Sequence, residues 1–375
     1  MIQELIDEYR PYNDSEVPAA LQRIAQDIYF PQIAQFVFPN KELHTFLEEF
    51  KQIRTVVEFQ EKIMNVAINR VVEKTISRLS YSGIEHLNKH TSYTFISNHR
   101  DIMLDSAILQ VILFSNNLPT SEITFGNNLM SSQLVIDIGK LNKMFKIVRG
   151  GTAREIFINS HNVSAYMRYA ITQKHESTWI AQRNGRTKDG NDKTEIAVLK
   201  MFAMSSKKSF AENLGELNIT PIAVSYEYEP CDFLKTREIY LSRQKTYVKE
   251  PGEDFNSIMQ GIKQFKGNTH YTICKPITAE ELADCEQLPP SEQYKALAAI
   301  IDKRIYAGYT LWKTNYMAHD LLHKKSEFAD RYSTEECEHF KNYMNKGLHL
   351  IDGNCNELQE IFLGIYANPV DKRKM

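Results

Sequence analysis

The chain of 375 residues is 42% hydrophobic and 25% charged, with a formal net charge of −2. These values are typical of a globular protein and exclude a global electrostatic attraction to nucleic acid or anionic lipid. The apolar runs fall well short of the about 20 residues that a membrane-spanning helix needs. We therefore expect a protein that is soluble or lies on a membrane surface.

The cysteines and the amino terminus bear on the cellular compartment. The five cysteines are scattered, odd in number and without the close spacing of a zinc or redox motif: Cys231, Cys274, Cys285, Cys337 and Cys355. The first residues are acidic and lack the basic start and apolar run of a signal peptide. We expect a cytoplasmic protein, either free or peripheral on the inner face of the membrane, and the sequence implies no metal.

Residues 1–90 have apolar positions at helical spacing and are predicted to form an N-terminal helical region. A first helix is expected from about Pro18, a second over 43–50, and a longer third one from about 57 to 79. A loop at 88–90 leads into the next region.

From 91 to 230, short β-branched or aromatic runs alternate with amphipathic segments. Strands are expected at 92–97, 122–126, 145–149, 178–182 and 219–226, and helices at 105–115, 129–140, 152–173 and 194–204. This alternation predicts an α/β fold, in which helices cover a central, twisted and mostly parallel sheet.

The remaining chain continues this domain and then becomes helical. Two further strands are expected at 238–242 and 269–276, with a helix near 254–265 between them. Helices are expected again over 292–322 and 334–367. Since no flexible linker interrupts the chain, we expect an α/β domain over 91–290 and a C-terminal helical region, 291–375, packed on it.

The first motif follows the strand at 92–97. Asn98-His99 is a turn-prone pair, and Asp105-Ser106 marks a helix start. A histidine at the carboxyl end of a strand lies where open α/β sheets hold ligands, and an acid nearby would let it act as a general base. A lone histidine at a strand end is also a common capping residue.

A second motif is basic. Five basic residues and no acid occur between 140 and 154: Lys140, Lys143, Lys146, Arg149 and Arg154. Gly150-Gly151 allows positive φ beside Arg149, whose guanidinium is suited to phosphate. The alternative is a solvated basic face.

A third motif comes after the apolar strand that contains Trp179. Its loop carries Arg183, Gly185, Arg186 and Lys188. This pattern indicates an anion-binding turn at the carboxyl edge of the sheet, with a surface hairpin loop as the alternative. A fourth motif is a buried-strand pattern at 219–227.

In this order, the four motifs resemble the glycerolipid acyltransferase family (glycerol-3-phosphate and 1-acylglycerol-3-phosphate O-acyltransferases). The resemblance spans roughly residues 85–230, including the lead-in that begins at Ser82, and it indicates a divergent branch. It implies that 91–290 is an acyltransferase domain with His99 as the general base and Asp105 as its orienting acid. The substrate-binding residues that it implies are Arg149, Arg183, Asn184, Gly185, Arg186, Lys188 and Pro221.

Two departures from the family pattern concern the site itself. Five residues instead of four separate His99 from Asp105, which leaves Asp101 as an alternative partner. Asn184 stands where the family has glutamate, so a charge is lost there.

The resemblance implies direct transfer of a fatty acyl group from an acyl thioester to a hydroxyl of glycerol-3-phosphate or a lysophospholipid in phospholipid synthesis. Acyl carrier protein or acyl-CoA would be the partner and co-substrate, with no further cofactor and no nucleic acid. Two alternatives remain: an acyltransferase for a non-phosphate lipid precursor, and a non-catalytic lipid-binding protein with the same fold.

Overall fold

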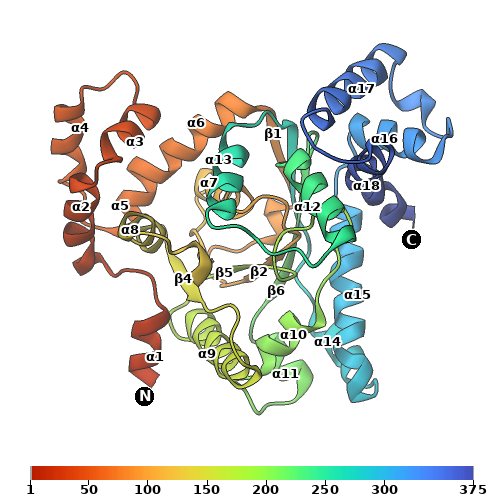
Figure 1. The fold of residues 1–375 in the computed structure, drawn as a ribbon. Helices are drawn as coiled ribbons and strands as arrows, with labels where there is room; N and C mark the ends of the chain where they lie inside the picture. Colours follow the sequence, from red (N-terminus) through yellow and green to blue (C-terminus); the bar gives the residue numbers. More distant parts are fainter. Residues whose placement is uncertain (1, 375) are drawn as a thin grey trace.

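The computed structural model describes residues 2–374, in which a mostly parallel sheet lies between two helical regions (Figure 1). The strand order is β1-β7-β6-β2-β5-β3-β4. The strands are β1 (Ile76–Ser82), β2 (Thr94–Ser97), β3 (Glu122–Gly126), β4 (Met144–Ile147), β5 (Thr178–Ala181), β6 (Ile219–Tyr226) and β7 (Gly267–Ile273). From β6 to β4 neighbouring strands are parallel, whereas β7 is antiparallel to β6 and pairs in parallel with β1. The α/β class and the mostly parallel sheet are confirmed.

The central strands form because their residues are apolar on both faces. All residues of β2, β5 and β6 are buried. Phe95 of β2 packs into one hydrophobic cluster and its neighbour Ile96 into another, on the opposite face. Strands buried on both faces are typical of parallel sheets that helices cover on each side.

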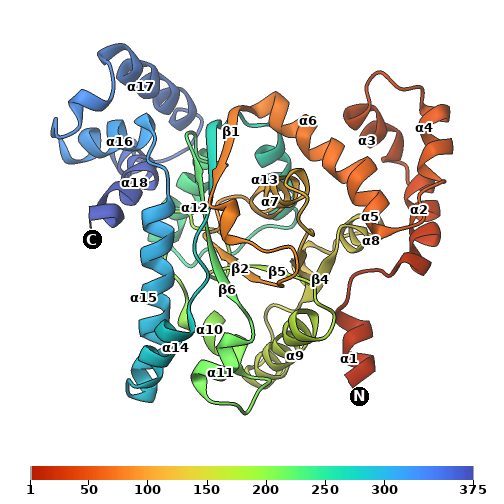
Figure 2. The ribbon, with the colours of Figure 1, turned by 180° about the vertical axis from the view of Figure 1, so that it is seen from behind.

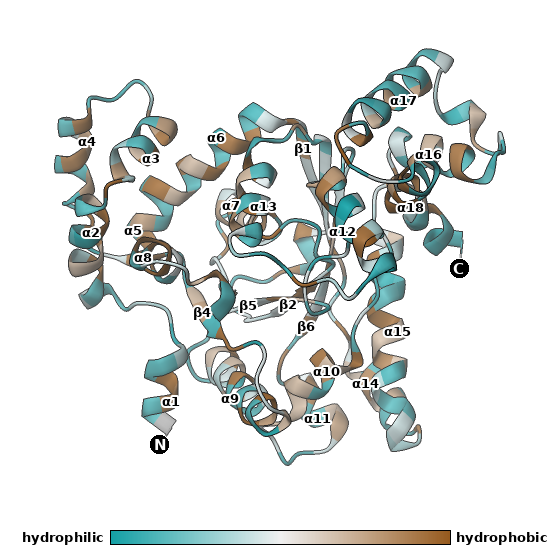
Figure 3. Cartoon of the chain, viewed as in Figure 1, coloured by the Kyte–Doolittle hydropathy of each residue, from teal (hydrophilic) through white to brown (hydrophobic). Residues whose placement is uncertain are grey.

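Helices form a layer on each face of this sheet. One face packs against α6 (Asn65–Thr75) and α7 (Leu104–Ser115). The other face packs against α9 (Ala153–Thr172), α10 (Ile196–Ala203), α11 (Phe210–Gly215), α14 (Ala279–Glu286) and α15 (Pro290–Gly308). Along helices such as α6 and α9, hydrophobic and hydrophilic residues alternate, as expected for one buried and one exposed side (Figure 3).

The helical regions at the two ends have cores of their own and lie on opposite sides of the sheet (Figure 2). The N-terminal core is formed by α2 (Val17–Gln26), α3 (Phe30–Val37), α4 (Leu43–Phe50) and α5 (Val56–Phe59), and α8 (Gln133–Leu141) packs on them. The first helix, α1 (Ile2–Tyr9), instead contributes Ile6 and Tyr9 to the core on the sheet face that α9 covers. The C-terminal helices are α16 (Lys313–His323), α17 (Thr334–Leu348) and α18 (Cys355–Lys374), which pack on α12 (Asp232–Gln244). Helix α13 (Glu253–Lys263) lies between β6 and β7 in the sequence.

Two expectations about single elements were wrong. The helix expected over 57–79 ends at Thr75, because the residues from Ile76 pair with β7 as strand β1. The strand expected at 238–242 lies within α12, where Tyr240 packs into the C-terminal core. A short β-branched and aromatic run suits either structure, and tertiary packing decides between them.

The C-terminal helices are shorter than expected. The segment 292–322 is divided into α15 and α16, and 334–367 into α17 and α18. Within residues 2–374, no helix combines the length and the apolar character that crossing a bilayer requires.

The connections of β2 and β5 position the candidate site. Strand β2 leads into α7 on one face of the sheet, whereas its neighbour β5 leads toward α10 on the other face. Where connections leave neighbouring parallel strands toward opposite faces, a crevice opens at the carboxyl ends of the strands.

Candidate active site

His99 lies at the carboxyl end of β2, in the turn that leads to α7. Its Nδ1 is 3.0 Å from Oδ2 of Asp105, and both side chains are buried. The Trp179 ring lies in an edge-to-face arrangement with the imidazole, with ring centroids 5.8 Å apart. Because a carboxylate only accepts hydrogen bonds, Nδ1 carries the proton and Nε2 is left as the acceptor. Within the described chain, Nε2 has no protein partner, so it is available to a substrate.

Four donors converge on the carboxyl group of Asp105. Besides the imidazole, Oδ2 accepts the backbone N–H groups of Arg100 at 2.6 Å and Asp101 at 2.9 Å. Oδ1 accepts the hydroxyl of Tyr226 at 2.9 Å, and burial together with the charge of Asp105 raises the pKa of that tyrosine well above its usual value. The five-residue spacing therefore forms a turn whose backbone folds around the acid.

Asp101, the alternative partner, has another contact. Its Oδ1 accepts the N–H groups of Met103 at 2.9 Å and Leu104 at 2.8 Å, at the start of α7. Burial and the charge of Asp105 raise the pKa of Asp101, and its Oδ2 has no hydrogen-bond partner. Between the two acids, the structure pairs His99 with Asp105.

The loop after β5 brings Arg186 to the histidine turn. Gly185 and Gly190 have φ values of +77° and +74°, a conformation that favours glycine. The N–H of Thr187 donates to the carbonyl of His99 at 2.7 Å, which joins this loop to the histidine turn. Arg186 is 8% exposed and its Nη1 has no hydrogen-bond partner, while its charge opposes the rise in the pKa of Asp101.

The other predicted residues of this loop are positioned differently. Arg183 is half-buried and its Nε is unpartnered. Lys188 forms an ion pair with Glu238 of α12. The N–H of Asn184 donates to Glu195 at 3.1 Å, and the residue is exposed. Arg183 and Arg186 therefore each keep a buried side-chain donor without a protein partner.

Arg149 lies beyond β4, where the predicted positive φ is found at Gly150 and Gly151 (+81° and +107°). Its N–H donates to Asn127 at 2.9 Å, and its side chain is so close to Gly126 that a Cβ there would lie 3.4 Å from Nε. Neighbouring lysines of the basic run are paired within the protein, Lys143 with Glu176 and Lys146 with Glu8.

Asp254 of α13 connects the two arginines. Partial burial lowers the pKa of Arg149, and the charge of Asp254 offsets part of this effect. Asp254 also interacts with the charge of Arg186. Burial opposes ionisation of Asp254, but Lys249, Asn128 and Arg186 together hold its pKa below the usual value. Arg149 and Arg186 therefore lie near the same carboxylate, which competes with any anion that binds there.

Pro221 lies within the sheet. It is opposite Ile96 of β2 in the register, and its carbonyl accepts the N–H of Cys274 at 2.9 Å. Its role in substrate binding stays a prediction.

Sequence reasoning missed a buried ionic network behind the histidine turn. Arg100 is fully buried and donates to Asp192 at 2.6 Å and to Glu229 at 3.1 Å. Lys235, also fully buried, donates to Glu229 at 2.5 Å and to the carbonyl of Arg100 at 2.7 Å. The partners of Arg100 lie 92 and 129 residues away along the chain, so no local pattern could have indicated them.

A second hollow lies at the opposite edge of the sheet, near the amino ends of the strands. It is lined by residues that precede the strands, among them Tyr93, His175 and Ser177. Since His99 lies past the carboxyl end of β2, this hollow is separate from the candidate site.

Comparisons with known proteins give one distant likeness. No protein-family model matches the chain, and no curated protein matches it either. Among solved structures, it is similar to the 1-acyl-sn-glycerophosphate (LPA) acyltransferase PlsC from Thermotoga maritima, with 11% sequence identity and a TM-score of 0.40. The match covers 78% of this chain and 94% of the other. At this level the likeness concerns the course of the fold alone.

Proposed function

We propose that the chain is an O-acyltransferase that moves a fatty acyl group from a thioester to a hydroxyl. The observation that supports this most is the buried pair of His99 and Asp105, which leaves Nε2 of the imidazole as an unpartnered base at the carboxyl edge of the sheet. A positioned base of this kind is what attack by a hydroxyl requires.

The reaction would proceed without a covalent enzyme intermediate. Nε2 of His99 takes the proton of the acceptor hydroxyl while its oxygen attacks the thioester carbonyl carbon. Asp105 stabilises the imidazolium that forms, and N–H groups of the loop after β5 are candidates to hold the developing oxyanion. When the carbon–sulfur bond breaks, the imidazolium returns the proton to the thiolate, so that the products are an ester and a free thiol.

Release of free thiol from acyl-CoA or acyl carrier protein thioesters, in the presence of candidate acceptors, tests this proposal. H99A should lower the rate by about 10²–10⁴-fold, as is typical for the loss of a general base. H161A, at an exposed position on α9, is the matched control and should keep wild-type activity. Activity of H99A within a few-fold of wild type would remove His99 from the role of general base, whereas no thiol release by the wild type would favour a non-catalytic lipid-binding role.

For the acceptor, we propose glycerol-3-phosphate or a lysophospholipid. Arg149 and Arg186 both interact with the charge of Asp254, and Arg186 is buried with an unsatisfied donor. R149A and R186A should raise KM for phosphate-bearing acceptors by about tenfold or more, because a charge-assisted hydrogen bond contributes about 1.5–3 kcal/mol. The exposed R331A serves as the control.

A non-phosphate lipid precursor is the second candidate acceptor. The specific observation in its favour is that Lys188 is paired with Glu238 and that Asp254 occupies the surroundings of both arginines. A head-group screen distinguishes the candidates, because a strong preference for acceptors without phosphate would contradict the role given to Arg149 and Arg186.

We also propose that the protein is cytoplasmic and acts at a membrane surface. Ile156, Phe157 and Ile158 on α9 are 49%, 63% and 45% exposed, and they follow the basic run that contains Arg149. Apolar side chains beside basic ones suit an anionic lipid interface. F157E should lower co-sedimentation with anionic liposomes, whereas L350E, at an 84% exposed position, should not. Equal co-sedimentation of both variants would contradict this placement.

A further inference from the structure

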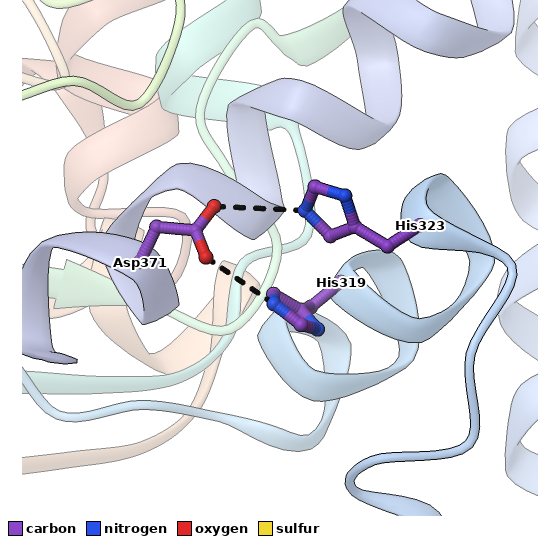
Figure 4. Close-up of side chains that lie close together, drawn as sticks. All are labelled: His319, His323 and Asp371. Carbon is purple, nitrogen blue, oxygen red and sulfur yellow. Dashed lines mark ion pairs between the residues drawn. The ribbon is translucent and has the colours of Figure 1, made fainter.

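Two histidines and an aspartate meet where α16 and α18 lie side by side (Figure 4). His319 and His323 are four residues apart, so one turn of α16 places both on the same side. Both rings point toward Asp371 of α18, with His319 Nε2 at 3.2 Å from Oδ1 and His323 Nε2 at 3.6 Å from Oδ2. A single carboxylate thus faces two imidazole nitrogens.

The donor atoms have the spacing that a metal ion requires. One ligand atom from each residue lies within 4.8 Å of the other two. Around Zn²⁺, ligand bonds of about 2.0–2.1 Å in a tetrahedral arrangement place donor atoms about 3.3 Å apart. The two nitrogen–oxygen distances already lie near that value, so rotation of the exposed His323 ring would complete the set.

The surroundings of His319 provide an independent observation. This side chain is 3% exposed, and its Nδ1 has no hydrogen-bond partner although Oδ1 of Asp320 lies 3.5 Å away. Asp320 is itself fixed by the N–H of Phe328 and the hydroxyl of Tyr332, both at 2.9 Å. Histidines that bind metals commonly direct their second nitrogen at a carboxylate fixed in this way.

The charge balance also suits a cation. Lys374, in the last turn of α18, is paired with Glu327 and lies over the Phe328 ring, so its charge is already matched. His323 and Asp371 are 39% and 41% exposed, which gives solvent access to a fourth coordination position. Imidazole nitrogen and carboxylate oxygen together suit Zn²⁺ and its neighbours Co²⁺ and Ni²⁺ better than Mg²⁺ or Ca²⁺.

We propose that His319, His323 and Asp371 bind a divalent transition metal of the zinc class, with water as a fourth ligand. The ion would fix the end of α18 against α16. Asn368, one turn before Asp371, donates to the carbonyl of Asp189 at 2.6 Å, in the loop after β5. The metal would therefore also hold α18 in its place against that loop, as a structural site separate from His99.

The test uses the full chain without a histidine tag, freed of metal by a chelator. Co²⁺ titration should give one equivalent of visible absorption with the intensity of a tetrahedral site, and Zn²⁺ should displace it. Zn²⁺ should also raise the melting temperature of the wild type by several degrees, because a ligand that binds only the folded state stabilises it. The melting temperature of the metal-free variants shows whether they fold.

H323Q and D371N each remove one ligand and should weaken Co²⁺ binding by at least tenfold. H339Q on α17 and D330N, both at exposed positions, are the matched controls and should bind as the wild type does. The proposal is overturned if the wild type does not bind Co²⁺ stoichiometrically, or if either ligand variant folds and keeps wild-type affinity. None of these readouts depends on acyl transfer.

Discussion

Substitution of Asp105 by asparagine is the most informative change at the candidate site. Three donors converge on Oδ2 of this residue, namely the imidazole of His99 and the backbone N–H groups of Arg100 and Asp101. An amide nitrogen could not replace Oδ2, because it would face these donors. The amide oxygen of the introduced side chain would therefore take that place and turn the amide nitrogen toward the hydroxyl of Tyr226, which can accept.

It follows that D105N removes the charge but keeps the protonated Nδ1 of His99. At about 4 Å and an effective dielectric constant of about 20, two unit charges interact by about 4 kcal/mol. Since about 1.4 kcal/mol corresponds to a factor of ten, loss of the whole interaction would cost nearly 10³-fold in rate. The remaining hydrogen bond to the amide oxygen retains part of it, so we expect a loss of about 10²–10³-fold in kcat/KM.

Thiol release with acyl-CoA measures the rate, and the nitrogen chemical shifts of His99 in a ¹⁵N NMR spectrum measure the tautomer. We expect Nδ1 to stay protonated in D105N. A neutral ring with the proton on Nε2 would refute the orientation derived for the amide, and a rate within tenfold of wild type would refute the electrostatic role of Asp105. Y226F, which removes the hydroxyl donor to Oδ1, should cost about tenfold only, because a hydrogen bond to a charged group contributes about 1.5 kcal/mol at the low end of its range.

Three further predictions concern stability and binding. R100M leaves the buried Asp192 without its cationic partner and Glu229 with Lys235 alone, so it should lower the free energy of unfolding in urea by about 3–5 kcal/mol. The exposed R331M should change it by less than about 0.5 kcal/mol. Burial lowers the pKa of Lys266 to about 8, against about 10.4 in the unfolded chain, so the unfolded state binds the extra proton in between. The free energy of unfolding should therefore rise with pH from about 8 to 10, by up to about 1.4 kcal/mol per pH unit. K266M should lose this rise, and the exposed K263M should keep it. Equal slopes in the two variants would contradict the assignment to Lys266. D254N removes a competing carboxylate and should lower KM for an anionic acceptor about fivefold, with KM for the thioester unchanged. A fivefold change in KM corresponds to about 1 kcal/mol of charge interaction. A higher KM would show that Asp254 helps to bind the acceptor.

The fold could be predicted where local patterns and tertiary packing agree. The strands at 219–226 and 122–126 have the predicted bounds, because both are short apolar or β-branched runs between turn residues. Strand β1 was missed because its first residues continue the apolar spacing of the preceding helix, and only pairing with β7, which lies about 190 residues further on, makes it a strand. The segment 238–242 shows the reverse case, in which packing against α18 imposes a helix.

The candidate site could be predicted as residue types, but not as pairings. His99 and Asp105 follow from a strand end and a helix start, yet the choice between Asp101 and Asp105 depends on the direction of side chains in a short turn. That direction is fixed by backbone N–H groups that the sequence does not reveal. The role of Lys188 in substrate binding stays a prediction, and the sequence could not reveal its ion pair with Glu238, 50 residues away.

The network behind His99 determines how this chain can be dissected. Lys235 donates to the carbonyl of Arg100, and the hydroxyl of Tyr271 donates to the carbonyl of Leu104 at 3.2 Å. The ring of Tyr309 covers the Arg100 guanidinium. A fragment that stopped near residue 230 would lack Lys235 and Tyr309, which contact Arg100 in the histidine turn. A minimal active fragment must therefore extend past Tyr309. By the same reasoning, a protease cut in the exposed segment 245–250 should leave two pieces that co-purify, held together by the pairing of β6 with β7.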